Sequence, residues 1–263
     1  LPILWFCGVF SKKKYLFVKG RSQTFKILKS KKVNIGKWVW FHCSSLGEFE
    51  QARQLILEFK KTFPKNKILL TFFSPSGYEN LKGFKAVNCV CYLPWDNKRN
   101  VKKFLDLCNI QIAIFIKYEF WPNLFKGLSK RKIPIYSVSS IFNSQQLFFK
   151  WYGKEYCKIL NLVKHFFVQN KKSISLLNSI NIDKVSFAGD TRFDRVYNLA
   201  SAKRKLDIME DFTGKFRCFV AGSTWPNDYR LIKYVLEKKQ QLKIIIAPHE
   251  VSKKSIKNLE KII

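Results

Sequence analysis

A serine and a glutamate stand three residues apart, directly after an apolar segment, in the run Ser44-Ser45-Leu46-Gly47-Glu48. This spacing is the capping-box pattern, in which Ser45 accepts a hydrogen bond from the Glu48 N–H and the glutamate reaches back. A carboxylate in the first turn of a helix is also held ionised by the helix dipole, so it can take a proton from a hydroxyl group. The run therefore has two interpretations, helix cap and general base, and one side chain can serve as both.

Four further segments combine hydroxyl, carboxyl or imidazole groups with a helix start after an apolar run. They are Ser74-Pro75-Ser76-Gly77-Tyr78, Lys117-Tyr118-Glu119-Phe120-Trp121-Pro122-Asn123, Gly222-Ser223-Thr224-Trp225-Pro226 and Pro248-His249-Glu250. In open parallel sheets, ligands bind at the carboxyl ends of strands, where helix N-termini present backbone N–H groups. Each segment is a candidate for binding, and each taken alone is equally an N-cap or a proline in a first helical turn.

The elements that position these segments follow from the apolar pattern. From about residue 37, short apolar runs rich in β-branched and aromatic residues alternate with longer segments of helical period. On the first such helix one stripe should pack on a sheet, formed by Phe49, Ala52, Leu55, Ile56, Phe59 and Phe63. The sequence predicts an α/β protein with a parallel sheet. We expect strands at 38–43, 68–73, 87–93, 110–116, 133–138, 165–168, 185–187, 216–221 and 242–247.

The chain has 263 residues and a formal net charge of +31, from 49 Lys and Arg against 18 Asp and Glu. Such a charge attracts polyanions, for example nucleic acid, anionic lipid or a phosphorylated substrate. The abundance of Lys, Asn, Ile and Phe equally fits a genome rich in A and T. Because the basic residues are dispersed in short runs such as 12–14 and 130–132, we expect no specific nucleic-acid partner.

Neither the cysteines nor the histidines form a metal-binding motif. The seven cysteines include no C-x-x-C pair, and His42, His165 and His249 are far apart in the sequence. Several cysteines lie in apolar runs, where a free thiol packs as a small apolar side chain. We expect a reducing cytosolic environment, no metal and no cofactor.

The apolar opening segment 1–10 is shorter than the ~20 residues that span a bilayer, and Lys12, Lys13 and Lys14 follow almost at once. This pattern is typical of an interfacial anchor or of the cytoplasmic end of a membrane helix. We expect residues 1–30 to be membrane-proximal. Since the chain begins with Leu, we also expect a preceding segment.

The ordered series of motifs resembles the Kdo transferases, which add 3-deoxy-D-manno-octulosonic acid (Kdo) to a lipid A precursor. The family's H-x-x-S-x-G-E is matched by His42, Ser45, Gly47 and Glu48, and its T-x-x-S/T-P-S/T-G by Thr71, Ser74, Pro75, Ser76 and Gly77. Its E-x-W-P-N is matched by Glu119, Trp121, Pro122 and Asn123, and its glycine-led K/R-F-D by Gly189, Arg192, Phe193 and Asp194. The last two motifs are matched by Gly222, Ser223 and Thr224 and by Pro248, His249 and Glu250. The resemblance covers the chain from its first strand nearly to its end.

The resemblance implies a GT-B architecture with two Rossmann-like domains, the first for the lipid acceptor and the second for the CMP-Kdo donor. It implies inverting transfer of Kdo to lipid IVA at the cytoplasmic face of the inner membrane, with the anionic membrane surface as a partner. Glu48 matches the general base. The implied acceptor-binding residues are Ser45, Gly47, Ser74, Ser76, Gly77 and Glu119, and the implied donor-binding residues are Arg192, Ser223, Thr224 and His249.

For several residues of the motif around Glu119, more than one role is possible. Glu119 binds acceptor hydroxyls, orients the surroundings of Glu48, or holds a nearby Arg or Lys. Many family members carry another acid where this chain has Lys117, which leaves that position without a role, and Trp121 and Pro122 equally shape a helix start. Two other functions stay open: another GT-B nucleotide-sugar transferase, or an inactive basic protein that binds membrane or nucleic acid by charge.

The pattern loosens around 189–194, where we place a domain boundary. We predict a membrane-proximal segment 1–30, an acceptor-binding domain 31–195 and the start of a donor-binding domain at 196–263. The last has room for two strand–helix units, too few to bury the faces of a parallel sheet. The family's later donor-binding motifs are also missing, so we expect this domain to be truncated.

Overall fold

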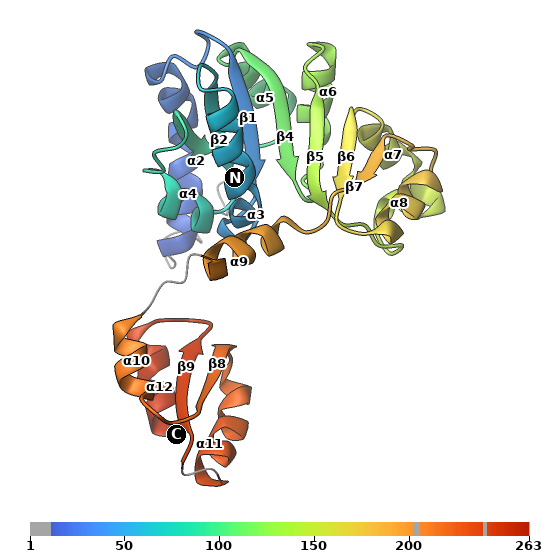
Figure 1. Cartoon of the computed structure of the whole chain (residues 1–263). Helices are drawn as coiled ribbons and strands as arrows, with labels where there is room; N and C mark the ends of the chain where they lie inside the picture. Colours follow the sequence, from blue (N-terminus) through green and yellow to red (C-terminus); the bar gives the residue numbers. More distant parts are fainter. Residues whose placement is uncertain (1–11, 202–205, 239–240, 263) are drawn as a thin grey trace. The chain divides into compact units, whose positions relative to one another are not determined.

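A computed structural model of the chain describes residues 12–201, 206–238 and 241–262 (Figure 1). The chain divides into two compact units between Asn198 and Leu199, within helix α9 (Thr191–Ser201). The sequence placed this boundary at residue 195. Each unit has a parallel sheet of its own.

The first unit is built on a seven-stranded sheet of order β3-β2-β1-β4-β5-β6-β7, and every neighbouring pair is parallel. The strands are β1 (Trp38–Cys43), β2 (Lys67–Phe72), β3 (Cys89–Tyr92), β4 (Ile110–Ile116), β5 (Ile135–Ser140), β6 (His165–Val168) and β7 (Val185–Phe187). The α/β class is confirmed, and the bounds of these strands differ from the predicted ones by two residues or fewer. Strand order reverses between β1 and β4, so this is the point where an open α/β sheet binds its ligands.

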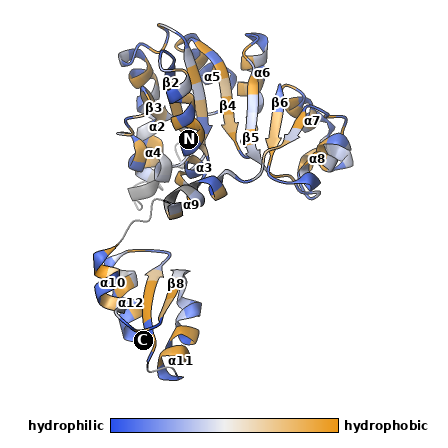
Figure 2. Cartoon of the chain, in the orientation of Figure 1, coloured by the Kyte–Doolittle hydropathy of each residue, from blue (hydrophilic) through white to orange (hydrophobic). Residues whose placement is uncertain are grey.

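Helices cover both faces of this sheet (Figure 1). They are α2 (Lys12–Ser30), α3 (Leu46–Thr62), α4 (Pro75–Leu81), α5 (Lys98–Asp106), α6 (Pro122–Lys130), α7 (Lys154–Leu160) and α8 (Lys171–Asn178), with short 3₁₀ turns at Leu147–Phe149 and Trp151–Gly153. Side chains alternate along β1: Trp38 and Trp40 share a core with α2, α5 and α6, whereas Val39 and Phe41 share another with α3 and α4. The apolar colouring of the strands in Figure 2 follows from this burial on two sides.

Helix α3 packs on the sheet as its apolar stripe predicts. Phe49, Ala52 and Ile56 are fully buried, and Leu55 and Phe59 are partly buried against the same core. Phe63 departs from the prediction and is half exposed. It is the C-cap residue, so it lies beyond the last helical turn and off the stripe.

Residues 12–30, which the sequence assigned to a separate membrane-proximal segment, form α2 and pack on the first unit. Leu28 is fully buried in the core, and Thr24 Oγ1 donates a hydrogen bond to the Tyr92 carbonyl at 3.0 Å. Residues 1–11 lie outside the described residues. Within the described ranges, no helix combines the length and apolar character needed to cross a bilayer.

The second unit contains a parallel pair of strands, β8 (Cys218–Thr224) and β9 (Lys243–Pro248). Its helices are α10 (Asp207–Thr213), α11 (Tyr229–Lys238) and α12 (Lys253–Ile262), with a 3₁₀ turn at Pro226–Asp228. The buried apolar cluster is small and consists of Ala221, Tyr229 and Ile232. Val220 on β8 and Leu231 on α11 are 64% and 70% exposed, as expected where two strands leave the sheet faces largely uncovered.

Candidate active site

Two carboxylates follow adjacent strands at the point where strand order reverses. Glu48 is in the first turn of α3, directly after β1, and Glu119 lies in the loop between β4 and α6. Because β1 and β4 are parallel neighbours, both residues lie at the same edge of the sheet. The sequence predicted both as site residues, and the topology brings them together.

The carboxylate of Glu48 is buried and hydrogen-bonded. Its Oε2 accepts from the Ser44 N–H at 2.5 Å, and the Glu48 N–H donates to Ser45 Oγ at 3.4 Å. Ser45 is therefore the N-cap that the sequence predicted, but the glutamate reaches one residue further back than a capping box requires. The side chain caps the helix start while it stays at the carboxyl edge of the sheet.

Burial decides the ionisation of Glu48. The pKa of this carboxyl group is raised to about 7. Burial is the largest cause and the negative charge of Glu119 adds to it, whereas the Ser44 N–H and the Lys117 ammonium group lower the pKa. The sequence instead led us to expect a carboxylate held ionised by the helix dipole. That expectation was wrong in direction, because the loss of water around a side chain that is 8% exposed outweighs the dipole. A pKa near neutrality suits a general base.

Glu119 faces an imidazole. Its Oε2 lies 3.6 Å from Nε2 of His42, a fully buried residue near the end of β1. Among the described residues, this imidazole is the basic side chain found within 4.0 Å of Glu119, in place of the Arg or Lys that one alternative required. The geometry favours the alternative in which Glu119 shapes the surroundings of Glu48.

A left-handed residue sets the loop that carries Glu119. Lys117 has φ 62°, and its carbonyl oxygen accepts from Ser137 Oγ at 2.9 Å and Ser140 Oγ at 2.8 Å. This conformation costs a non-glycine residue roughly 1 kcal/mol, which the two hydrogen bonds offset. The position therefore fixes the loop through its backbone, a role that no sequence pattern indicated.

The start of α6 is fixed from another loop. Trp121 is its N-cap and Pro122 its first residue, which confirms the helix-start interpretation. The N–H groups of Asn123 and Leu124 donate to the Asp96 carboxylate at 3.0 and 2.8 Å. Asp96 was not predicted, because the run Asp96-Asn97 before α5 gives a signal only for the start of that helix.

The β2–α4 loop and the first turn of α4 bring Ser74 and Ser76 to the same edge as Glu48. The Ser74 N–H donates to the Ser44 carbonyl at 2.8 Å, and Ser74 Oγ lies 2.7 Å from Ser76 Oγ. Ser74 is the predicted N-cap, although its side chain makes no bond to the helix N–H groups. Gly77 is buried: an added Cβ would lie 2.1 Å from Phe72 Cδ1, so this glycine serves packing. A Cβ on Gly47 would meet Ser45 Oγ at 3.9 Å, which leaves that position open.

Three of the four predicted donor-binding residues gather in the second unit. Ser223, with φ 57°, places Oγ 2.9 Å from Nδ1 of His249, at the carboxyl ends of β8 and β9. Trp225 stacks on His249 with ring centroids 4.4 Å apart. Thr224 Oγ1 is buried without a hydrogen-bond partner in the described part of the chain. The strand ends thus present a hydroxyl, an imidazole and an aromatic face together.

Arg192 lies in the first unit and is engaged locally. Its guanidinium group contacts both Asp190 carboxylate oxygens, with Nε 2.8 Å and Nη2 2.5 Å from Oδ2. This pair lowers the pKa of Asp190. The other three predicted donor-binding residues, Ser223, Thr224 and His249, belong to the second unit. A role of Arg192 in donor binding requires a guanidinium group that can leave Asp190.

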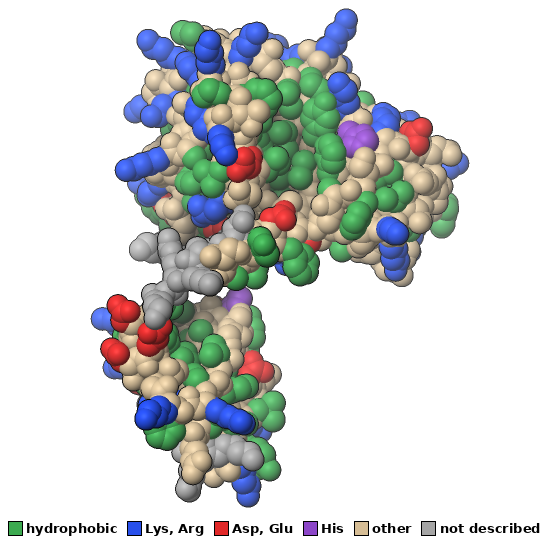
Figure 3. Space-filling view, in the orientation of Figure 1, with side chains coloured by type: hydrophobic (Ala, Val, Ile, Leu, Met, Phe, Trp, Pro, Cys, Tyr) green, Lys and Arg blue, Asp and Glu red, His purple; other side chains and the backbone are tan. Residues whose placement is uncertain are grey.

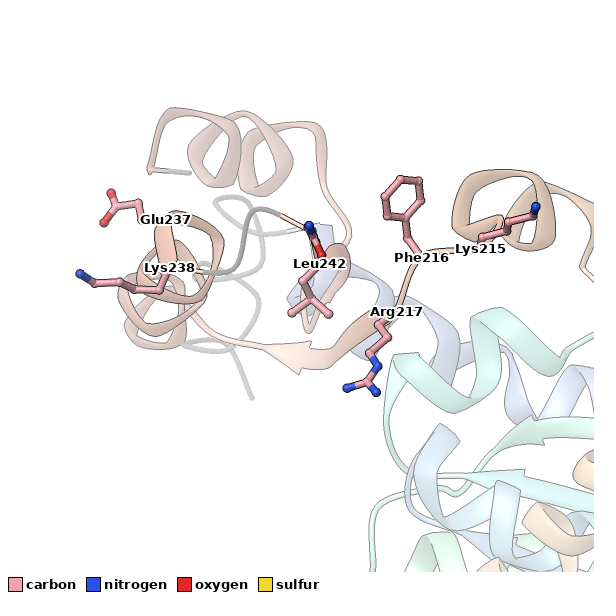
Figure 4. Close-up of a pocket in the computed structure, with 7 residues that line it drawn as sticks. Lys215, Phe216, Arg217, Glu237, Lys238 and Leu242 are labelled. Carbon is pink, nitrogen blue, oxygen red and sulfur yellow. The ribbon is translucent and has the colours of Figure 1, made fainter.

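A hollow of about 850 Å³ in the second unit contains none of the predicted site residues. Figure 4 shows its lining, in which Phe216 and Arg217 precede β8 and Leu242 precedes β9. It therefore lies at the amino ends of these strands, opposite the edge where parallel sheets bind ligands. Within the described ranges, no three His, Cys, Asp or Glu side chains are placed to hold a metal ion.

Comparison with known proteins identifies relatives whose sequences are similar to that of this chain. The model of the 3-deoxy-D-manno-octulosonic-acid transferase (kdotransferase) family matches residues 17–195. A bifunctional glycosyltransferase/methyltransferase of Fusobacterium nucleatum is 28% identical over 95% of this chain and 39% of its own length. The 3-deoxy-D-manno-octulosonic acid transferases of Aquifex aeolicus and Haemophilus influenzae are 24% and 22% identical over 83% and 94% of this chain. The chain spans 56% and 60% of the lengths of these two enzymes.

Solved structures agree with the fold. The UDP-N-acetylglucosamine 2-epimerases of Listeria monocytogenes (putative) and Neisseria meningitidis match with TM-scores of 0.61 and 0.60 at 10% and 14% identity. The two matches cover 87% and 86% of this chain, and 67% and 69% of the epimerase chains. The wall teichoic acid polymerase TagF matches with a TM-score of 0.51 at 11% identity, over 93% of this chain and 66% of its own. These similarities show a GT-B fold, as predicted, and at this identity they show no more than the fold.

The family match extends over the whole first sheet and includes Glu48, Glu119 and the loops that hold them. Several 3-deoxy-D-manno-octulosonic acid transferases also match most of the chain. Together, the family match and these relatives show the family of the chain. The chain belongs to the Kdo transferase family of glycosyltransferases.

Proposed function

We propose that the enzyme transfers Kdo from CMP-Kdo to the lipid A precursor lipid IVA with inversion, and that Glu48 is the general base. One observation carries the proposal: a buried carboxylate with a pKa of about 7 stands at the strand-reversal edge of the first sheet, beside a second carboxylate. The motif residues around it match the family. The names of the Aquifex aeolicus and Haemophilus influenzae relatives state the transfer of 3-deoxy-D-manno-octulosonic acid, which supports the coarser part of the proposal.

The chemistry needs a base at this position. An acceptor hydroxyl oxygen attacks the anomeric carbon of Kdo, the bond from that carbon to the CMP oxygen breaks, and CMP leaves with the bond electrons. The hydroxyl proton passes to Glu48 as the new bond forms, and such assistance typically contributes ~10²–10⁴-fold. Since Glu48 is hydrogen-bonded by Ser44 through Oε2, its Oε1 is the oxygen left to take that proton.

Acceptor and donor groups divide between the units. Around Glu48 we assign acceptor binding to Ser45, Gly47, Ser74 and Ser76, which lie at the carboxyl edge of the first sheet. To Glu119 we assign the role of shaping the surroundings of Glu48. We assign donor binding to Ser223, Thr224 and His249, whose hydroxyl and imidazole groups suit a phosphate at a helix start without a metal.

A membrane location suits an acceptor that is a lipid. With a net charge of +31, we propose that the enzyme lies at the anionic cytoplasmic face of the inner membrane, where each Lys or Arg near the surface contributes about 1 kcal/mol. Figure 3 shows these side chains spread over the visible face of the first unit rather than gathered in one stripe. This distribution fits a general attraction to membrane, not a nucleic-acid groove.

The test is an assay with CMP-Kdo and lipid IVA, using the chain and a version lengthened at its C-terminus to the length of the curated relatives. We expect Kdo transfer that Glu48→Gln reduces at least 100-fold and that the exposed Glu58→Gln, on the same helix, leaves unchanged. Turnover of a UDP-sugar instead of CMP-Kdo would favour another GT-B enzyme. Binding without turnover, with steep salt dependence and no effect of Glu48→Gln, would favour a charge-binding protein.

A further inference from the structure

We propose that His42 is a positioning residue: its Nε2–H holds the carboxylate of Glu119, and Trp40 and Thr71 set the tautomer that makes this possible. The catalytic meaning of this inference rests on the proposed function. The contact itself is a property of the first unit and can be tested without turnover.

The network begins with a group that can only donate. The indole Nε1–H of Trp40 lies 2.8 Å from Thr71 Oγ1, and the same oxygen lies 2.8 Å from His42 Nδ1. Trp40 and His42 point to the same side of β1, and Thr71 stands beside His42 in the register of β1 and β2. All three side chains are fully buried, so water does not compete for these bonds.

The direction of the second bond follows from the first. An indole has no acceptor, so Thr71 Oγ1 accepts from Trp40. Thr71 still has its own hydroxyl proton, and within the described residues the other partner of this oxygen is His42 Nδ1. A buried donor without an acceptor is unfavourable, so Thr71 donates to Nδ1. The neutral imidazole then carries its proton on Nε2.

That proton points at Glu119. His42 Nε2 is completely buried, has no hydrogen-bond partner in the described part of the chain, and lies 3.6 Å from Glu119 Oε2. The distance is somewhat beyond a hydrogen bond, and catalytic contacts of this kind often tighten only when substrate binds. The rings of Phe115 and Trp121 flank the imidazole, with centroids 5.6 and 6.4 Å away, and hold it in this orientation.

The consequence is a fixed negative charge near the base. Glu119 is one of the groups that raise the pKa of Glu48. With its carboxylate held by His42, this charge stays in place while acceptor hydroxyls bind. Four side chains thus form a continuous series of contacts from β1 and β2 to the β4–α6 loop: Trp40, Thr71, His42 and Glu119. Through these contacts the sheet fixes the position of the Glu119 carboxylate near Glu48.

The first test is ¹⁵N NMR of the histidine rings in the chain, with His42 assigned by its loss in His42→Gln. We expect the neutral His42 ring to show Nε2 protonated and Nδ1 unprotonated. Thr71→Ser, which keeps the hydroxyl, should retain this pattern, and Thr71→Val should shift the ring toward a mixture of tautomers. A ring protonated at Nδ1 in the wild-type chain, or a pattern that Thr71→Val leaves unchanged, overturns the proposal.

The second test addresses the contact with Glu119. We expect Glu119→Gln to move the Nε2–H proton resonance of His42, and Glu58→Gln to leave it in place. An unmoved resonance in Glu119→Gln overturns the proposal. Neither spectrum depends on turnover, so a failed transfer assay together with these shifts would refute the proposed function and leave the positioning contact standing.

The third test links the contact to catalysis in the lengthened enzyme. In metal sites, loss of a residue that orients a ligand side chain typically costs about 10–100-fold in activity, and we take the same range for a residue that orients Glu119. We expect His42→Gln to lower kcat within this range and to leave KM for CMP-Kdo unchanged. A kcat equal to that of the wild type would show that His42 serves only the packing of the sheet.

Discussion

The Glu48 carboxylate accepts its hydrogen bond from the N–H of Ser44, at 2.5 Å, one residue before the N-cap Ser45. This contact draws the side chain back over the end of β1 and into a site where it is 8% exposed. One oxygen is thereby committed to the backbone, while burial raises the pKa of the group to about 7. The two effects oppose each other, and burial wins.

A pH dependence of stability follows from this pKa. The carboxyl group titrates at its ordinary value of 4.5 when unfolded and at about 7 when folded, so the folded state binds more protons between these values. Stability should therefore be greatest below pH 4.5 as far as this group is concerned, and fall as pH rises to about 7. The whole contribution is on the order of 3 kcal/mol.

Urea unfolding at pH 5 and pH 7.5 measures this contribution. The side chain in Glu48→Gln does not titrate. We therefore expect the free energy of unfolding of this variant to lack the decrease between pH 5 and pH 7.5 that Glu48 causes in the wild type. Glu58→Gln changes an exposed glutamate of the same helix and should follow the wild type. Equal pH dependence in the wild type and Glu48→Gln would contradict a raised pKa.

Gly47→Ala separates two explanations of this glycine. Gly47 has no left-handed φ, and an added Cβ would make only an ordinary contact with Ser45 Oγ at 3.9 Å. Alanine should therefore leave the free energy of unfolding unchanged or raise it by up to about 1 kcal/mol. If the glycine admits the acceptor, KM for lipid IVA should rise, as measured in the lengthened enzyme. Unchanged KM would assign Gly47 to ordinary turn chemistry.

Local patterns predicted what depends on neighbours in the sequence. The strands followed from apolar runs such as Ile112-Ala113-Ile114-Phe115-Ile116, and the caps at Ser45 and Ser74 from the residue types that start helices. The pKa of Glu48 did not follow, because it depends on burial beneath loops distant in the sequence. The helix dipole was the only influence visible from residues 44–48.

Contacts between strands set the rest of the site. His42 and Thr71 meet because β1 and β2 pair with these residues opposite each other, a register that the sequence does not state. A histidine and a threonine within apolar strands were the available signal, and their motif positions were noted without a role. The packing of residues 12–30 on the first unit did not follow from the sequence for a similar reason: it depends on a loop some fifty residues later. The membrane-proximal assignment of residues 1–30 stays a prediction.

Gly77→Ala should destabilise the first unit. A Cβ at this position would lie 2.1 to 2.7 Å from three atoms of the Phe72 ring, which is itself fully buried. Overpacking of this kind typically costs ~1–3 kcal/mol. Gly83→Ala is the matched control, since a Cβ there meets nothing within 4 Å. We expect urea unfolding to show the loss for Gly77→Ala alone; comparable values for both variants would mean that Gly77 is not held by packing.

Arg21 joins α2 to the carboxyl edge of the sheet. Its Nη2 donates to the Phe73 carbonyl at 2.5 Å and its Nη1 to the Phe17 carbonyl at 3.0 Å. The guanidinium carbon lies 3.8 Å from the Phe17 ring centroid, 4.4 Å from that of Phe73 and 4.6 Å from that of Trp95. Burial lowers the pKa of this group to about 10, so it remains charged at neutral pH.

Arg21→Lys keeps the charge and removes the planar fork, so it tests whether the geometry matters. A lysine cannot reach two carbonyls in this arrangement or stack flat on the rings, and we expect a loss of ~1.5–3 kcal/mol in urea unfolding. Lys26→Arg makes the reverse change at an exposed position of α2 and should stay within about 0.5 kcal/mol. Because Phe73 directly precedes Ser74, a loosened α2 should also broaden the amide resonances of Ser74 and Ser76. Sharp resonances there in an Arg21→Lys variant of wild-type stability would show that α2 does not support the site.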